Sequence, residues 1–149
     1  MRFRSIATLM IGLALPLQAV ADEMKTAILY KNPQCGCCEK YADYLRQHAY
    51  SVTVKPSFDL SLINEQAGVP KALEGCHTTM VGGYVVEGHV TAELIDRLLT
   101  EKPNIRGISL PGMPMGSPGM EGAKAGPLDV YEIAQDAKVD EGLKFYGTE

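Results

Sequence analysis

The stretch "NPQCGCCEKY", residues 32–41, places three cysteines within four positions. A short apolar run at residues 27–30 precedes it, and apolar residues then recur with the spacing of one helix face. We therefore predict that the cysteines stand where a strand is followed by a helix. Cys35 and Cys38 have the C-x-x-C spacing of a redox dithiol, and the free N–H groups at a helix start favour thiolate over thiol. Cys37 is unusual because it adds a third thiol between these two.

The chain after the motif predicts six further elements. The helix that the motif opens covers residues 38–49, and a short run at residues 52–54 predicts a second strand. Residues 59–67 predict a helix with an aspartate cap and a glycine stop. Residues 79–90 predict two strands around a Gly-Gly turn, and residues 91–99 predict a third helix with a threonine cap. The predicted order is β-α-β-α-β-β-α, which is an α/β domain.

The C-terminal part of the chain has a different composition. Residues 107–127 are rich in glycine and proline and contain three methionines, so we expect a loop rather than a regular element. A short strand is predicted at residues 130–133. The last residues, 134–149, are polar, and we expect a mobile tail there. The folded unit is therefore predicted to be one domain over residues 22–133.

The N-terminal segment has the features of a targeting sequence. A basic start, an apolar run at residues 6–17 and a small-x-small pattern at residues 19–21 predict a signal peptide covering residues 1–21. The run is shorter than the ~20 residues of a membrane span, so we expect cleavage and no membrane association afterwards. Export would place all four cysteines in an oxidising compartment, and a bacterial periplasm fits the short signal. The net charge of −4, with no basic cluster, argues against nucleic acid as a partner.

The motif and the hairpin together resemble part of a known superfamily. "YKNPQC" followed by a helix is similar to the active-site motif of glutaredoxin-like and arsenate-reductase-like proteins of the thioredoxin superfamily. In glutaredoxins a cis-proline shortly before the hairpin faces this motif, and His77 occupies that place here, directly after Cys76. The resemblance implies a thioredoxin-like, glutaredoxin-like fold in which Cys76 lies against the other three cysteines. It also implies that Gly88 and His89 lie in the loop that normally touches the substrate thiol.

A closer resemblance extends over most of the predicted domain. The pieces "CGCC", "GVP", "CHT", "VGGYVVEGHV" and "LPGMPMGSPGME" are similar to the CopG-type periplasmic copper-resistance family. This resemblance implies a thioredoxin-like domain with a Met/Gly/Pro-rich C-terminal loop extension. It also implies copper binding at the cysteines and a role in copper detoxification.

The residues themselves indicate a soft metal. Four converging thiolates suit Cu(I), Zn(II) or an iron–sulfur cluster, and thioethers in addition favour Cu(I) over zinc. An iron–sulfur cluster would have to be assembled before export, which disfavours it. Neighbouring cysteines such as Cys37 and Cys38 fit poorly around one ion, so we expect several thiolate-bridged Cu(I) ions. We predict these main ligands: Cys35, Cys37, Cys38 and Cys76. We predict these secondary ligands: His77, His89, Met113, Met115 and Met120.

Two classes of function follow from this pattern. The first is a periplasmic copper-binding protein for copper resistance, which exchanges copper with an efflux system or a metallochaperone. The sequence leaves open whether such a protein is also an enzyme that cycles copper between Cu(I) and Cu(II). The second class is a thiol–disulfide oxidoreductase with Cys35 as nucleophile and Cys38 as resolving thiol. The missing cis-proline and the extra Cys37 weaken this second reading, and a purely structural role as two disulfides also stays open.

Overall fold

Strand β1 (Lys25–Lys31) lies between two partners in the computed structural model, which describes residues 24–136 and 143–149. It pairs in parallel with β2 (Tyr50–Pro56) and antiparallel with β3 (His77–Val81). Alternate residues of β1 are buried, as expected for a strand that packs one face on a core. The antiparallel register pairs Lys31 with His77, so the end of β1 lies beside the start of β3.

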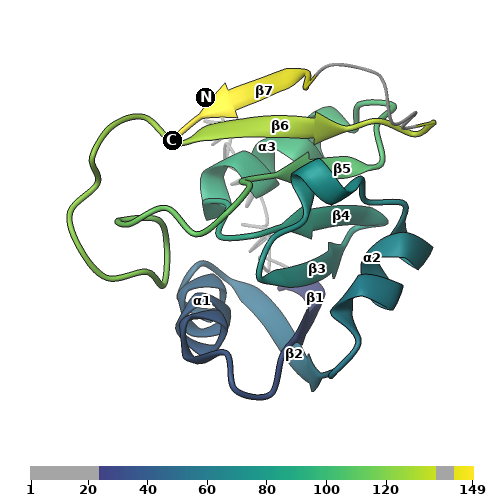
Figure 1. The fold of residues 1–149 in the computed structure, drawn as a ribbon. Coiled ribbons are helices and arrows are strands. Elements are labelled where there is room, and N and C mark those ends of the chain that lie inside the picture. Colours follow the sequence, from purple (N-terminus) through teal and green to yellow (C-terminus); the bar gives the residue numbers. More distant parts are fainter. Residues whose placement is uncertain (1–23, 137–142) are drawn as a thin grey trace, which may run out of the picture.

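The described residues form one mixed α/β domain around a seven-stranded sheet with the order β2-β1-β3-β4-β5-β6-β7 (Figure 1). The remaining strands are β4 (Tyr84–Glu87), β5 (Gly107–Ser109), β6 (Asp129–Ile133) and β7 (Phe145–Thr148). The helices are α1 (Gly36–Gln47), α2 (Leu60–Ala67) and α3 (Ala92–Glu101), with a 3₁₀ turn, η1, at Lys71–Leu73. The predicted order of elements from β1 to α3 is confirmed, with η1 added before β3.

The caps that the sequence indicated begin α2 and α3, whereas α1 covers Gly36–Gln47 rather than residues 38–49 and α3 runs to Glu101. Asp59 caps α2 by accepting from the N–H of Leu62, and Gly68 ends this helix with a left-handed backbone. Thr91 caps α3 through its side chain. The cap of α1 is Cys35, whose Sγ accepts from the N–H of Cys38 at 3.3 Å. The cysteine motif is therefore part of the helix start itself.

The sheet carries helices on both faces. The larger core lies on the side of α1 and α3 and contains Leu29 of β1, Val86 of β4 and Ile108 of β5. A smaller core lies on the other side, between the segment after α2 and residues such as Val85 of β4 and Ile133 of β6. Figure 1 shows α1 beside β2 and β1, with α2 on the opposite side of the sheet. Each face of β4 thus packs on a different core.

The expectation that residues 107–127 contain no regular element is wrong at their start. Gly107 begins β5, which pairs in parallel with β4. A Cβ atom at Gly107 would lie 1.8 Å from the carbonyl oxygen of Val85. The glycine that indicated a loop is therefore required because two strand backbones approach closely here.

The expectation of a mobile tail over residues 134–149 is also not met where the chain is described. Residues Phe145–Thr148 form β7 and pair with β6 at the edge of the sheet. Arg97 of α3 anchors this strand, because its guanidinium lies 4.1 Å from the ring centroid of Tyr146 and donates to the Tyr146 carbonyl at 2.6 Å. The ordering contacts come from α3, which is distant in sequence.

The segment predicted as a signal peptide, residues 1–21, lies outside the described residues. Among the residues that the structure describes, no helix has both the length and the apolar composition needed to cross a membrane.

Replacing Gly107 by alanine tests the close approach of β4 and β5. Gly107→Ala should lower the free energy of unfolding by at least about 3 kcal/mol, because a backbone atom cannot move aside without separating the strands. Gly126→Ala is the control, since nothing lies within 4 Å of a Cβ there, and it should change stability by less than about 0.5 kcal/mol. Urea unfolding measures both, and equal stability of the two variants would contradict the strand contact.

Candidate metal centre

The four cysteines meet at the N-terminus of α1. Their Sγ atoms all lie within 4.8 Å of one another. Sγ of Cys35 lies 3.5 Å from that of Cys37, and Sγ of Cys38 lies 3.7 Å from that of Cys76. The structure therefore brings Cys76 to the CGCC motif although 38 positions separate it from Cys38.

The cysteines are not equivalent in this structure. Cys35 and Cys38 are joined by a disulfide, with their Cα atoms 5.4 Å apart, whereas Cys37 and Cys76 are free. Cys38 is fully buried and the other three are partly exposed. The site thus holds one oxidised pair and two thiols, and each free thiol lies beside one member of the disulfide.

Two histidines extend the cluster on the side of Cys76. His77 Nδ1 lies 3.3 Å from Cys76 Sγ, and His89 Nε2 lies 3.1 Å from the same sulfur. The Nδ1 atom of His89 lies 2.6 Å from the carbonyl oxygen of Pro118, which leaves Nε2 directed at the sulfur. The ring of Tyr41 packs on both imidazoles and fixes their positions. Cys76 therefore belongs to a sulfur group and to a mixed sulfur and nitrogen group.

Burial sets the protonation of these side chains. It lowers the pKa of His77 to about 3, with the neighbouring His89 adding to the shift. Burial also lowers the pKa of His89. Both imidazoles are therefore neutral near pH 7 and keep a lone pair for a metal. Burial, followed by the charge of Cys37, raises the pKa of Cys76 to about 12, so in the absence of a cation this group is a thiol.

The methionine-rich segment lies in the connection between β5 and β6. Met113 and Met115 are 56% and 60% exposed, whereas Met120 is partly buried. The Met115 side chain folds against Gly122 of its own loop, where its sulfur would lie 3.3 Å from an added Cβ. The structure thus places two of the three predicted thioether ligands on the surface of this loop.

The same loop packs on the start of α1. Gly119 fits closely against the helix, because a Cβ there would lie 2.7 Å from the N atom of Tyr41 and 3.0 Å from the carbonyl oxygen of Cys37. An ion pair of 2.6 Å between Lys40 and Glu121 lies next to this contact. Figure 1 shows the loop passing on the α1 side of the sheet. The loop therefore forms one wall of the cysteine site and carries the carbonyl that orients His89.

Three buried residues at the site were not singled out from the sequence: Lys31, Tyr41 and Glu87. Tyr41 belonged to the apolar helix face, where nothing distinguishes a contact with imidazoles from ordinary packing. Glu87 interrupts the apolar run "YVVEGHV". A carboxylate inside such a run could have indicated a buried polar residue. Its Oε2 accepts from the N–H of Gly75 at 2.9 Å and so ties the end of β4 to the residue before Cys76.

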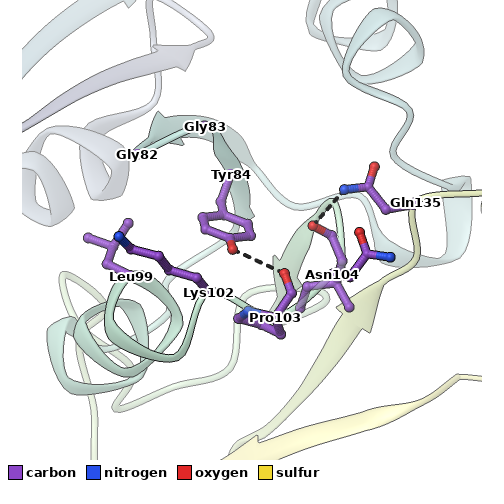
Figure 2. A pocket seen from close by; sticks show the side chains of 9 residues that line it. Gly82, Gly83, Tyr84, Leu99, Lys102, Pro103, Asn104 and Gln135 are labelled. Atoms are coloured by element: carbon purple, nitrogen blue, oxygen red, sulfur yellow. Dashed lines mark hydrogen bonds between the residues drawn. The ribbon is translucent and has the colours of Figure 1, made fainter.

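A cavity of about 710 Å³ lies elsewhere on the molecule (Figure 2). It is found at the Gly82-Gly83 turn, which is the end of the β3–β4 hairpin opposite to Cys76 and His89. Figure 2 shows the Tyr84 hydroxyl donating to the carbonyl of Pro103 in its wall. No cysteine or histidine is among the lining residues of this cavity, so it is separate from the sulfur cluster.

Comparisons with known proteins give one family and two solved structures. A family model described as "Protein of unknown function, DUF411" matches residues 73–120. A solved structure described as "Copper resistance protein copG- Form 2" is 30% identical, with a TM-score of 0.77, and the match covers 85% of this chain and 99% of that one. A second, "Copper resistance protein copG- Form 1", is also 30% identical, with a TM-score of 0.74 and coverages of 83% and 96%. No match was found among curated proteins.

Substitution of Gly119 tests whether the loop shields the cysteines. Gly119 has φ +80°, and Gly83 in the β3–β4 turn has φ +85° but open space around it. Alanine should therefore cost about 1 kcal/mol of backbone strain at either position. Only Gly119→Ala should push the loop away from α1 and speed alkylation of Cys37 and Cys76 several-fold, as measured by peptide mass after iodoacetamide treatment. Equal alkylation rates in the two variants would contradict the wall formed by the loop.

A second prediction concerns the buried carboxyl of Glu87. Burial raises its pKa from 4.5 to about 7, against the opposing hydrogen bond from Gly75. Between these two pH values the unfolded chain loses this proton and the folded chain keeps it, so stability falls as pH rises. Glu87→Gln removes this fall. The variant should gain on the order of 3 kcal/mol relative to the parent between pH 4.5 and pH 8, in urea unfolding. If the free energy of unfolding depends on pH in the same way in both proteins, folding does not raise the pKa of Glu87 and the prediction is wrong.

Proposed function

Because the chain belongs to the family of the copper resistance protein CopG, we propose that it binds Cu(I) with Cys35, Cys37, Cys38 and Cys76. The convergence of four sulfur atoms within 4.8 Å carries this proposal. Each sulfur has the other three as near neighbours, so thiolates here can share ions between them. Cu(I) accepts bridging soft ligands, and the adjacent Cys37 and Cys38 fit poorly around a single ion. The proposed cargo is therefore several Cu(I) ions in one cluster.

Copper binding by all four thiolates requires the disulfide to be opened. Reduction of the Cys35–Cys38 bond takes two electrons and two protons, which an external dithiol supplies as it becomes a disulfide itself. Loading of copper then releases the protons from the thiols that become ligands. In this proposal the oxidised protein is the empty form and the reduced protein is the form that binds copper.

The imidazoles suggest how the site treats oxidised copper. His77 and His89 both point a ring nitrogen at Cys76, and imidazole is a good ligand for copper. We propose that these nitrogens, with the thioethers of Met113, Met115 and Met120 as further ligands, would hold copper as Cu(I) or as Cu(II) at the edge of the cluster, each Cu(I) that is oxidised giving one electron to an external acceptor. The exposed methionines would then serve exchange with a partner rather than tight binding.

The setting of this activity is part of the same proposal. The order β2-β1-β3-β4, with α1 between the parallel strands, supports a thioredoxin-like core. The cysteine motif at the helix start supports the same assignment. We propose that the chain acts in the periplasm after removal of residues 1–21, and that it passes copper to an efflux system or a metallochaperone.

A cleavage site after Ala21 would be visible as Asp22 at the N-terminus of exported protein in intact-mass measurement.

One observation favours the alternative of a thiol–disulfide oxidoreductase. The Cys35–Cys38 disulfide lies at a helix start, and Cys35 is partly exposed, as an attacked sulfur must be. An oxidoreductase of this kind needs these two cysteines alone, whereas a bridged copper cluster needs all four. The two functions therefore differ in their demand for Cys37 and Cys76.

Serine substitutions separate the two functions. Cys37→Ser and Cys76→Ser should each lower the amount of Cu(I) bound by more than a quarter, because each bridging thiolate holds more than one ion. Both should also abolish copper tolerance in cells. Met113→Leu is the control and should affect affinity or exchange rather than stoichiometry. Metal analysis of protein reduced and loaded without oxygen measures the result. Full copper binding and protection by Cys37→Ser would refute the cluster and favour the oxidoreductase.

A further inference from the structure

Lys31, the last residue of β1, is a charged side chain enclosed beneath the cysteine loop. Its side chain is 2% exposed, and its backbone is paired with Pro56 of β2 on one side and His77 of β3 on the other. Lysine is among the residues that are almost never fully buried, because a desolvated ammonium is costly unless polar partners replace the water. An aliphatic side chain would fill this place without that cost, so the charge itself requires an explanation.

Four oxygen atoms surround the Lys31 ammonium. Nζ donates to the carbonyl oxygens of Asn32, Pro33 and Cys35 at 3.2, 3.3 and 3.3 Å, and it lies 3.0 Å from a carboxylate oxygen of Glu39. All three carbonyls belong to the segment that joins β1 to α1. The ammonium thus satisfies its three N–H groups by folding this segment around itself. One of the carbonyls it holds belongs to a cysteine of the cluster.

The charge of Lys31 is only partly cancelled by its carboxylate partner. Glu39 is 54% exposed, so water screens its field, whereas Lys31 is enclosed by protein. The sulfur of Cys35, whose carbonyl Lys31 holds, lies 3.5 Å from that of Cys37. Because an enclosed charge is weakly screened, we expect its positive potential to act on the sulfur of Cys35, the residue whose carbonyl it holds. Free thiolates are anionic, and so is any complex with fewer Cu(I) ions than thiolates.

We propose that Lys31 is a positioning residue that holds the loop bearing Cys35 and supplies the buried positive charge that balances the thiolates of the cluster. Glu39 determines how much of this charge the sulfurs experience. The part of the inference that concerns copper rests on the proposed function. The part that concerns thiolates needs no copper and can be tested on the disulfide alone.

The test measures the equilibrium of the disulfide with glutathione in three variants at pH 8. The Cys35–Cys38 disulfide gains two electrons and two protons from two glutathione molecules, which leave as one glutathione disulfide. Lys31→Met should lower the equilibrium constant for reduction about tenfold, because the thiolates lose a nearby cation. Glu39→Gln should raise it a few-fold, because the same cation is then less compensated. Asp43→Asn is the matched control, since Asp43 lies on the same helix but pairs with Arg46, and it should change nothing.

The proposal is supported if the equilibrium constant for reduction falls in Lys31→Met and rises in Glu39→Gln. A purely structural role would change both constants in the same direction or leave both unchanged. Shifts of the same sign, or unchanged constants, overturn it. If Lys31→Met does not fold, Glu39→Gln and Asp43→Asn decide the question. A raised equilibrium constant for reduction in Glu39→Gln but not in Asp43→Asn supports the proposal, and equal constants overturn it.

The same variants are then titrated with Cu(I) against bicinchoninate. Failure of the parent protein to bind Cu(I) would refute the proposed function. The role of Lys31 would then be decided by the glutathione equilibrium alone.

Discussion

The antiparallel register of β1 with β3 is the constraint on which the site depends, because it pairs Lys31 with His77. From this pair β1 continues into the loop that bears Cys35, and Cys76 stands directly before β3. The sulfur atoms of Cys38 and Cys76 therefore lie 3.7 Å apart, although 38 positions separate these residues in the sequence. A slip of one residue would turn His77 to the other face of the sheet, and a slip of two would move Cys76 by about 7 Å. The ladder hydrogen bonds of this strand pair therefore bring Cys76 and His77 to the cysteine motif.

The second half of the sheet supports the same site from the opposite side. Strands β5 and β6 hold the two ends of the loop that packs on α1, and that loop carries the carbonyl of Pro118 that orients His89. Beneath the cluster, Lys31 provides a cation and Glu87 ties β4 to the residue before Cys76. The sulfurs are thus surrounded by groups that set their charge and orientation, while three of the cysteines stay partly exposed. Such a site can both bind a soft ion and exchange it.

The local part of this architecture was readable from the sequence, and the long-range part was not. Caps at Asp59 and Thr91 and the Gly-Gly turn depend on neighbouring residues, so their patterns predicted the elements correctly. The approach of Cys76 to the motif came from a family resemblance, since nothing in its own surroundings indicates a partner 38 residues away. The sequence did not indicate β7, because Arg97 of α3 orders it, nor β5, because Gly107 was counted as part of a Gly/Pro-rich loop although it marks a close contact of two strands. Lysine and glutamate are usually exposed, so the burial of Lys31 and Glu87 could not be predicted from their residue types.

X-ray absorption spectroscopy can determine whether copper binds among these four sulfurs. The reduced protein would be loaded with Cu(I) in the absence of oxygen and measured at the copper edge. We expect a nearest shell dominated by sulfur, together with scattering from neighbouring copper ions that share bridging thiolates. A nearest shell of nitrogen and oxygen alone, with no copper neighbour, would contradict it.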